Sequence, residues 1–538
     1  MFSSPISRAE IPQKMFFIGA VILVGLGVYM QIWAEATGDK EWLLLAARKL
    51  LSGKHLYADI FETNPPLILW LYSLPVSFSL YPGFPTDTQC LALLALGVVA
   101  ISILLSMRVM AFHPEFAGNN ERQGAFALLL CFIFIFWTIP NYFAGREPLF
   151  LALAFPYLLR CSPTLAGVPM PRRLRIMIGC MGAVGFCIKP QCMIVFLGMQ
   201  ALVVARERSQ RILWSLENRI LYVGGLVYLL SVWLLTPDFL TTVLPMEWAT
   251  YRYFTWGFHT LYFTPSFLML APAFLAFRRG KVSPYRKDVL YFLAVCLTML
   301  LYVFANNGWN YTFYPLDSMA AFTVAWLWWE YRWLRRDAEG HGTLRRSWFQ
   351  GGYVCGLLLG CKVALMLIVD NILLSQPILP DADREISVDL IRLVRQHHVH
   401  SFASLAPIFQ PFTALENSTD AHMETRFHHL WMMQAFAVAG EDFAKEYRWI
   451  PAYVAGALAE DMDRRKPGMI FVDTSPEFYS AGKPFALIAY FSKYPAFREA
   501  WTHYHYLEDV DHCSAESGGS TVRKRRDDCR YAVYERQF

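Results

Sequence analysis

The polar side chains whose types and spacing could do chemistry gather mainly between residues 35 and 87 of this mostly apolar chain. It opens with the run GDKEW at 38–42, which leads into a stretch rich in Leu and Ala that ends at Gly53. This pattern predicts an interfacial helix over 40–52 with Asp39 at its start. A carboxylate at that position caps the helix by accepting backbone hydrogen bonds, and an exposed carboxylate can also take a proton from a hydroxyl group.

Three more polar residues follow in the segment LYADIFETNPPL at 56–67. Asp59 and Glu62 either bind an acceptor molecule or order the loop. Asn64 precedes Pro65 and is typical of a turn. The segment is therefore a second candidate for substrate contacts, with loop ordering as the simpler interpretation.

Two cations stand beside prolines in connections that otherwise carry little positive charge. Arg146 lies in GREP at 145–148, and Lys189 precedes Pro190. The simplest roles are an ion pair of Arg146 with Glu147, and extension of the Lys189 ammonium to the membrane interface. A third group is aromatic: Trp309, Tyr311 and Tyr314 could stack on a sugar or belong to an interfacial belt.

The composition identifies the elements that must position these residues. Of 538 residues, 55% are apolar and 17% are charged, whereas soluble domains have about 25% charged residues. The apolar residues recur in blocks along 15–371. These features exclude a soluble enzyme, a disordered chain, a small disulfide scaffold and a single-anchor protein, and they predict a polytopic helical membrane protein.

Eleven membrane spans are predicted, since about 20 apolar residues cross a bilayer. They lie near 15–34, 88–112, 124–139, 148–160, 175–188, 190–205, 219–237, 260–277, 288–305, 312–330 and 350–371. The Arg-rich connections 160–175, 206–219, 278–287 and 331–346 are assigned to the cytoplasm. The N-terminus is then cytoplasmic and the C-terminus lies on the outer side, and these basic loops are not a nucleic-acid site.

This orientation makes 175–205 a hairpin of two short helices with Lys189 and Pro190 at its outer tip. It also requires that the proline-rich segment 65–82 does not cross, so 35–87 becomes one large outer loop. After residue 371 the composition changes: a helical pattern over 386–397 and a short strand over 469–472 predict a soluble α/β domain over 372–538. His428 and His429 lack a third metal ligand at suitable spacing and are interpreted as a surface pair.

The order of these motifs resembles the GT-C superfamily of membrane glycosyltransferases. The features that carry the likeness are an acidic residue after the first span, an interfacial helix, the YAD and PPL segments at 57–59 and 65–67, GREP in the next outer loop, and Gly185 followed by Lys189 and Pro190. The pattern is most similar to protein O-mannosyltransferases and to bacterial transferases that modify lipid A with aminoarabinose or galacturonic acid. The likeness covers 15–205, and the rest of the chain agrees in architecture.

The resemblance implies an inverting transferase that takes a sugar from a polyprenyl-phosphate donor and gives it to a lipid, glycan or protein at the outer face of a bacterial inner membrane. Asp39 would be the general base, and Lys189 and Arg146 would hold the donor phosphate. Glu147 occupies the place of the second acidic motif. The motifs read Asp-Lys-Glu and Arg-Glu instead of the commoner paired acids, so a divalent metal is possible but not required.

Two rival interpretations remain open. A transporter or flippase of lipid-linked sugars has similar hydropathy, although such proteins place ionisable residues near the membrane midplane and often contain inverted repeats. Here the ionisable residues gather at the outer rim and no repeat is visible. An inactive scaffold with the same fold is the third possibility. The sequence names neither the sugar nor the acceptor.

A disulfide between Cys513 and Cys529 is predicted if the C-terminal domain is periplasmic. They are the two cysteines beyond residue 371, and the periplasm is an oxidising compartment. Closing this loop would stabilise the domain by about 3 kcal/mol in the chain-entropy model. Thiol counting on denatured protein, with and without reductant, checks the bridge. Two free thiols in this domain would contradict it and weaken the periplasmic assignment.

Overall fold

The computed structural model describes most of the chain. Several predicted features lie outside the described residues: the spans 260–277 and 350–371, Pro190, Trp309, and the pair Cys513 and Cys529. The described residues are 10–34, 36, 38–137, 142–189, 191–207, 210–253, 286–305, 310–339, 382–407, 409, 411–474, 485–510 and 531–537.

The chain divides into two compact units. The helical unit comprises Met1–Lys40, Leu74–Leu230 and Trp256–Leu365, and the sheet unit comprises Glu41–Ser73, Ser231–Thr255 and Met366–Phe538. The sheet unit thus contains the C-terminal segment that the sequence assigned to a soluble domain. It also includes Glu41–Ser73, which the sequence placed in an outer loop, and Ser231–Thr255, which the sequence divided between the end of the span 219–237 and the connection that follows it.

Helices fill the described part of the helical unit. Three helices have residues in both units: α2 (Asp39–Leu51), α3 (Pro66–Ser79) and α9 (Leu216–Leu235). The others are α1 (Glu10–Trp33), α4 (Asp87–Met110), α5 (Asn120–Cys131), the π-helix η1 (Phe132–Phe136), α6 (Arg146–Arg160), α7 (Arg172–Cys187), α8 (Cys192–Glu207), η3 (Gln210–Trp214), α13 (Arg286–Ala305), η6 (Asn310–Phe313) and α14 (Tyr314–Glu339).

Described helices overlap every predicted span except the two that lie outside the described residues. Among them, the segments Asp87–Met110, Leu216–Leu235 and Lys287–Ala305 are both long and apolar enough to cross a membrane. The segments Val21–Trp33, Pro66–Ser79 and Cys192–Arg206 are apolar but shorter. The helix α3 has 14 residues, and at about 1.5 Å per residue it reaches roughly 21 Å, less than the hydrocarbon thickness of a bilayer.

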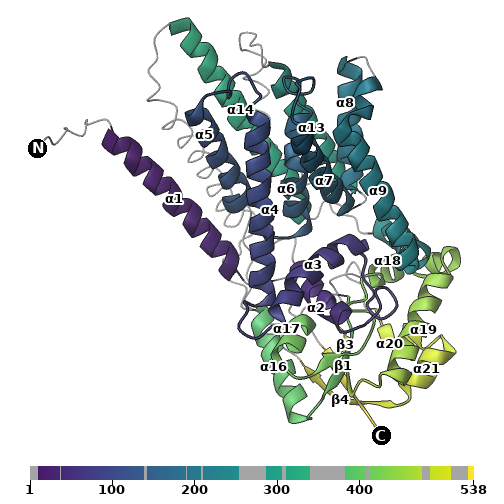
Figure 1. Ribbon diagram of the computed structural model, residues 1–538. Coiled ribbons are helices and arrows are strands. Elements are labelled where there is room, and N and C mark those ends of the chain that lie inside the picture. Colours follow the sequence, from purple (N-terminus) through teal and green to yellow (C-terminus); the bar gives the residue numbers. More distant parts are fainter. Residues whose placement is uncertain are drawn as a thin grey trace, which may run out of the picture. The chain divides into compact units, whose positions relative to one another are not determined.

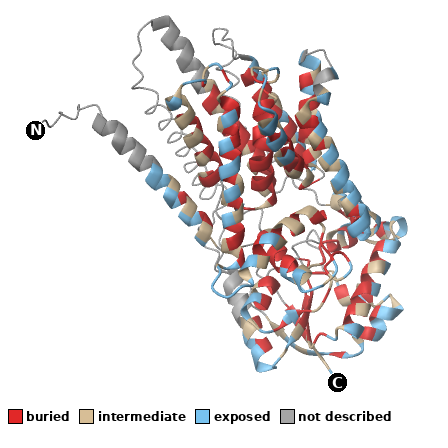
Figure 2. Cartoon of the chain, in the orientation of Figure 1, coloured by how far each residue is buried: buried red, intermediate tan, exposed pale blue. Residues whose placement is uncertain are grey.

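The helix α6 lies at the centre of the helical unit. All of its residues from Arg146 to Arg160 are buried, and it packs against both α4 and α7 (Figure 1). The outward-facing residues of the bundle lie on its peripheral helices, such as α9 (Figure 2). A helix that is buried on every side transmits any displacement to its neighbours, because close-packed interiors leave little free space.

The described part of the sheet unit contains one mixed β-sheet. Its strands are β1 (Ser401–Leu405), β2 (His422–Met423), β3 (Met469–Asp473), β4 (Tyr504–Val510) and β5 (Tyr531–Arg536), in the order β2-β1-β3-β5-β4. Its helices are η4 (Phe239–Val243), α10 (Leu244–Thr250), η5 (Tyr251–Tyr253), α16 (Ala382–Gln396), α17 (Phe412–Ser418), α18 (Met433–Glu446), α19 (Trp449–Arg464), α20 (Leu487–Phe491) and α21 (Pro495–Trp501).

The predicted α/β character of this segment is confirmed. The strand β1 pairs in parallel with β2 and β3, whereas β5 pairs antiparallel with β3 and β4. The helix α16 and the strand β3 stand where the sequence predicted a helix and a strand. Every residue of β3 is buried, and aromatic side chains such as Phe402, Phe412 and Phe471 fill the core beside the sheet.

The outer segment 41–73 folds as part of the sheet unit. The backbone N–H of Phe61 donates to the Arg426 carbonyl at 2.8 Å, and the Asp59 carboxylate pairs with Arg465 at 2.7 Å. In the last turn of α2, Lys49 pairs with the buried Glu416 at 3.2 Å. These contacts join residues about 370–400 positions apart in sequence, so the outer segment and the C-terminal segment form one structural unit.

The interpretation of His428 as a surface residue is wrong. Its side chain is 1% exposed and stacks on Trp42, with ring centroids 3.8 Å apart. Burial lowers the pKa of His428 well below its usual value, and the nearby His429 and Lys49 lower it further. The local sequence does not reveal this burial, because the stacking partner comes from α2, far earlier in the chain.

Acid should therefore destabilise the sheet unit through His428. Below about pH 6.5 an unfolded His takes up a proton that the buried, neutral His428 does not. The free energy of unfolding then falls as the pH falls, by up to about 1.4 kcal/mol per pH unit. Thermal melts of the full chain in detergent between pH 7.5 and pH 5 measure this loss. His428→Phe keeps a stacking ring and should reduce the slope, while His429→Phe serves as the control; equal slopes in all three proteins would contradict the assignment.

Candidate active site

The start of α6 positions two of the candidate site residues. Before it, Ala144 has a positive φ of 65°, an uncommon conformation for a residue other than Gly. The next position requires a glycine, because a Cβ at Gly145 would lie 2.8 Å from the Tyr142 carbonyl oxygen. Arg146 and Glu147 then occupy the first turn, and Pro148 is tolerated there because the first N–H groups of a helix have no partner within it. The tight turn thus fixes the direction of both charged side chains.

Glu147 is a buried carboxylate with two identified donors. Its Oε1 accepts a hydrogen bond from Lys189 Nζ at 2.6 Å and from the Tyr302 hydroxyl at 3.2 Å. Glu147 is 3% exposed and Lys189 is 6% exposed. The first turn of a helix also favours a carboxylate, because the helix dipole is positive there. Lys189 comes from the connection between α7 and α8, so this ion pair joins the hairpin tip to the start of α6.

Arg146 faces the other candidate carboxylate. Its guanidinium pairs with Asp39 at the start of α2, where Gly38 takes a positive φ of 61° to turn the chain. The Arg146 side chain is 6% exposed, whereas that of Asp39 is 43% exposed. Asp39 thus begins a helix as predicted, and its carboxylate interacts with a cation 107 positions later in sequence.

The ring of Tyr311 contacts both cations. The Arg146 Cζ atom and the Lys189 Nζ atom each lie 5.4 Å from its centroid, within the range of cation–π attraction. Two carboxylates, two cations and this ring therefore form one cluster, which we call the charged cluster: Asp39, Arg146, Glu147, Lys189 and Tyr311. Its formal charges sum to zero when no substrate is bound.

Burying these charges is costly unless they are paired and hydrogen-bonded. Within an apolar bundle such a cluster is a candidate functional site, since ionisable residues among membrane helices often mark substrate or ion sites. Lys40, next to Asp39, adds a further buried cation. Burial lowers its pKa to about 8, so Lys40 loses its charge within the mildly alkaline range.

The other polar candidates of the outer loop lie in the sheet unit. The Glu62 carboxylate accepts hydrogen bonds from the Trp42 indole N–H and from the backbone N–H of Asn64, the latter at 2.8 Å. Asp59 accepts from the backbone N–H of His55 and pairs with Arg465. Burial raises the pKa of Asp59, but these two partners more than offset it, so the pKa lies below its usual value. All these contacts order the loop.

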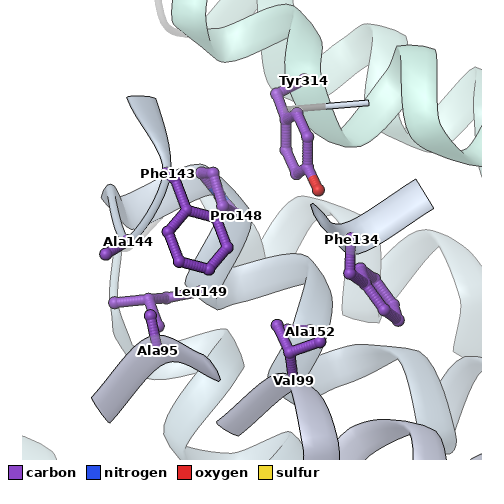
Figure 3. Close-up of a pocket in the computed structure, with 9 residues that line it drawn as sticks. All are labelled: Ala95, Val99, Phe134, Phe143, Ala144, Pro148, Leu149, Ala152 and Tyr314. Carbon is purple, nitrogen blue, oxygen red and sulfur yellow. The ribbon is translucent and has the colours of Figure 1, made fainter. Parts of the chain in front are cut away.

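The aromatic candidates divide between two places. Tyr311 belongs to the charged cluster. Tyr314 instead donates its hydroxyl to the Ile133 carbonyl at 3.3 Å and lines a small apolar pocket with Phe134 and Phe143 (Figure 3). This pocket includes Pro148, and it therefore adjoins the first turn of α6.

Sequence reasoning did not find Tyr302. Its side chain is fully buried, and its hydroxyl is one of the two identified donors to Glu147. The available signal was a phenol near the outer end of the predicted span 288–305. That position is also typical of an interfacial aromatic belt, so the sequence alone did not separate the two roles.

A metal ion does not fit the charged cluster as it stands. Each of its two carboxylates faces a cation, and within the described ranges no group of three or more His, Cys, Asp or Glu side chains is arranged to hold a metal.

Comparison with known proteins identifies the fold. No family model matches the sequence, and no curated protein matches it significantly. Among solved structures, the chain is similar to ArnT from Cupriavidus metallidurans bound to undecaprenyl phosphate, with a TM-score of 0.50 over 97% of both chains. At 12% sequence identity this likeness concerns the fold alone. The resemblance that the motif order predicted is therefore supported at the level of the fold, which is similar to that of ArnT.

A double-mutant cycle should reveal the coupling between Lys189 and Glu147. Lys189→Met leaves a buried carboxylate without its closest cation and should cost about 3–5 kcal/mol of stability, as is usual for a broken buried pair. The double variant Lys189→Met/Glu147→Gln removes both charges and should recover most of that loss. Tyr302→Phe, the control, removes one hydrogen bond and should cost about 1 kcal/mol.

Reversible unfolding of the purified chain in mixed micelles gives these free energies. If the losses in unfolding free energy of Lys189→Met and Glu147→Gln add up to that of the double variant, the ion pair does not form.

Proposed function

We propose that this protein is an inverting glycosyltransferase of a bacterial inner membrane. It takes a sugar from a polyprenyl-phosphate donor and transfers it to an acceptor hydroxyl at the periplasmic face. The observation that carries the proposal is the charged cluster at the start of α6. It supplies two cations and an exposed carboxylate on a fold similar to that of ArnT, whose structure contains undecaprenyl phosphate.

The cations are suited to hold the donor phosphate. Lys189 and Arg146 both lie against the ring of Tyr311, and we propose that both contact the same phosphate group. The start of α6 adds the positive end of the helix dipole, which favours an anion. Charge that develops on the leaving phosphate is then stabilised by groups already in place.

Asp39 is the proposed general base. Its carboxylate would take the proton of the acceptor hydroxyl as the hydroxyl oxygen forms a bond to the anomeric carbon of the sugar. The bond from that carbon to the phosphate oxygen breaks, and its electron pair leaves with the polyprenyl phosphate. Because a phosphate is a good leaving group, no separate general acid is needed.

The Asp39–Arg146 pair suggests an order of binding. In the structure the Arg146 guanidinium occupies the Asp39 carboxylate through an ion pair. A donor phosphate competes for the same guanidinium. Donor binding would therefore release Asp39 to accept a proton, so the donor should bind before the acceptor reacts.

The membrane topology is part of the proposal. Eleven spans place the N-terminus in the cytoplasm, and they place the charged cluster and the sheet unit on the periplasmic side. One support is the set of Arg-rich connections, which the proposed topology places in the cytoplasm. The other is the helix α3, whose 14 residues suit a segment that does not cross the membrane.

Asp39→Asn should abolish sugar transfer without loss of folded protein. The amide keeps the shape of the side chain but cannot take the proton, and a general base typically contributes 10²- to 10⁴-fold to the rate. Asp59→Asn is the matched control from the same outer loop and should remain active, because Asp59 contacts residues of the sheet unit. Mass spectrometry of envelope lipids and glycans, with and without each variant, measures the product.

Transport of a lipid-linked sugar without any transfer product would instead support the flippase. Unchanged product in cells that contain Asp39→Asn would remove Asp39 from the mechanism.

A further inference from the structure

The contact of α7 with α6 at Gly185 is unusually close. A Cβ at this position would lie 2.9 Å from the Leu153 Cβ, 3.2 Å from the Ala154 backbone nitrogen and 3.3 Å from the Phe150 carbonyl oxygen. Two of these three atoms belong to the backbone of α6, so no side-chain rotation could make room. The two helices can approach this closely because residue 185 has no side chain.

The opposite side of α7 is also tightly packed, against the first half of α9. A Cβ at Gly179 would lie 3.1 Å from the Glu217 carbonyl oxygen, and a Cβ at Gly224 would lie 2.8 Å from the Ala183 Cβ. Arg175, near the start of α7, donates two hydrogen bonds to the Glu217 carboxylate, at 2.8 and 2.7 Å. The helix α7 is therefore wedged between α6 and α9 and cannot move away from α6 as a rigid body.

The end of α7 leads directly to Lys189. The backbone N–H of Ile188 donates to the Gly185 carbonyl at 3.3 Å, and Lys189 follows and reaches Glu147 at 2.6 Å. Glu147 stands on α6 one turn before Phe150, which is one of the residues that Gly185 contacts. The separation of α6 and α7 at Gly185 therefore sets the distance over which Lys189 must reach.

We propose that Gly185 is a positioning residue: it sets the separation of α6 and α7 and thereby holds the Lys189 ammonium group against Glu147, at the place where the donor phosphate binds. The phosphate part of this inference rests on the proposed function. The placement of Lys189 against Glu147 does not, and it can be measured without a substrate. A methyl group at position 185 must displace the C-terminal end of α7, because the rest of the helix is held by α9.

The same helix provides a matched control. A Cβ at Gly182, three residues earlier, would meet Tyr157 at 3.4 Å and Leu221 at 3.6 Å, which are ordinary van der Waals contacts with side chains. Gly182→Ala therefore adds the same methyl group to the same helix and loses the same glycine. It should leave the end of α7 in place.

Two readouts on the full chain in lipid nanodiscs test the proposal. The first is the double-mutant-cycle coupling of Lys189 and Glu147, repeated in the Gly185→Ala and Gly182→Ala backgrounds. The second is the affinity for undecaprenyl phosphate. In Gly185→Ala the coupling should largely disappear and the affinity should fall at least tenfold, while Gly182→Ala should resemble the wild type in both. Adding Lys189→Arg to Gly185→Ala should restore part of the affinity, because the longer side chain spans a wider gap.

The outcomes separate the two proposals. Suppose that the coupling is lost in Gly185→Ala but that the wild-type protein does not bind undecaprenyl phosphate. This result supports the role of Gly185 in placing Lys189 and overturns the phosphate role of Lys189. Retained coupling and affinity in Gly185→Ala overturn the positioning role. If Gly185→Ala does not fold, the swap Leu153→Gly/Gly185→Ala removes the shortest of the three contacts but keeps the two backbone contacts at 3.2 and 3.3 Å. The swap should then weaken the coupling and the affinity to a smaller extent, and wild-type values of both would overturn the positioning role.

Discussion

The burial of the Glu147 carboxylate in an apolar bundle is the constraint on which the site depends. A charge in such surroundings must be matched by nearby cations and hydrogen-bond donors. Lys189, Tyr302 and Arg146 meet this need from three different segments of the chain. The start of α6, the tip of the α7–α8 hairpin and the end of α13 must therefore converge. The same convergence brings two cations to one place, where an anionic substrate could bind.

A second buried carboxylate holds the opposite end of α6. Glu217, 2% exposed, accepts from Arg160 at the end of α6 and from Arg175 on α7. One turn before Arg160, Tyr157 joins Gln200 and Asn218 in a group of buried hydrogen bonds. The helix α6 is thus fixed at both ends by polar contacts. Between them, the glycines of α7 allow its neighbours to pack closely. Arg146 and Glu147 of the charged cluster therefore stand on a buried helix that is held at both ends, which suits a site that must hold its substrate in one geometry.

Local patterns in the sequence predicted the local parts of the site. The helix that begins at Asp39 and the hairpin tip at Lys189 each follow from neighbouring residue types, whereas the turn that precedes Arg146 was not predicted. Their pairing could not be predicted in this way, because Asp39 and Arg146 are 107 positions apart and either could have had a local partner. The prediction that His428 lies on the surface was wrong for the same reason, since its burial depends on Trp42. The close contact at Gly185 likewise depends on α6, a different part of the chain.

The most direct test of this account is a cryo-electron microscopy structure of the full chain in nanodiscs with added undecaprenyl phosphate. We predict phosphate density within hydrogen-bond distance of both Lys189 and Arg146, with the Asp39 carboxylate released from Arg146 and open to solvent. Phosphate density at another place, with the Asp39–Arg146 and Glu147–Lys189 pairs both intact, would contradict the account.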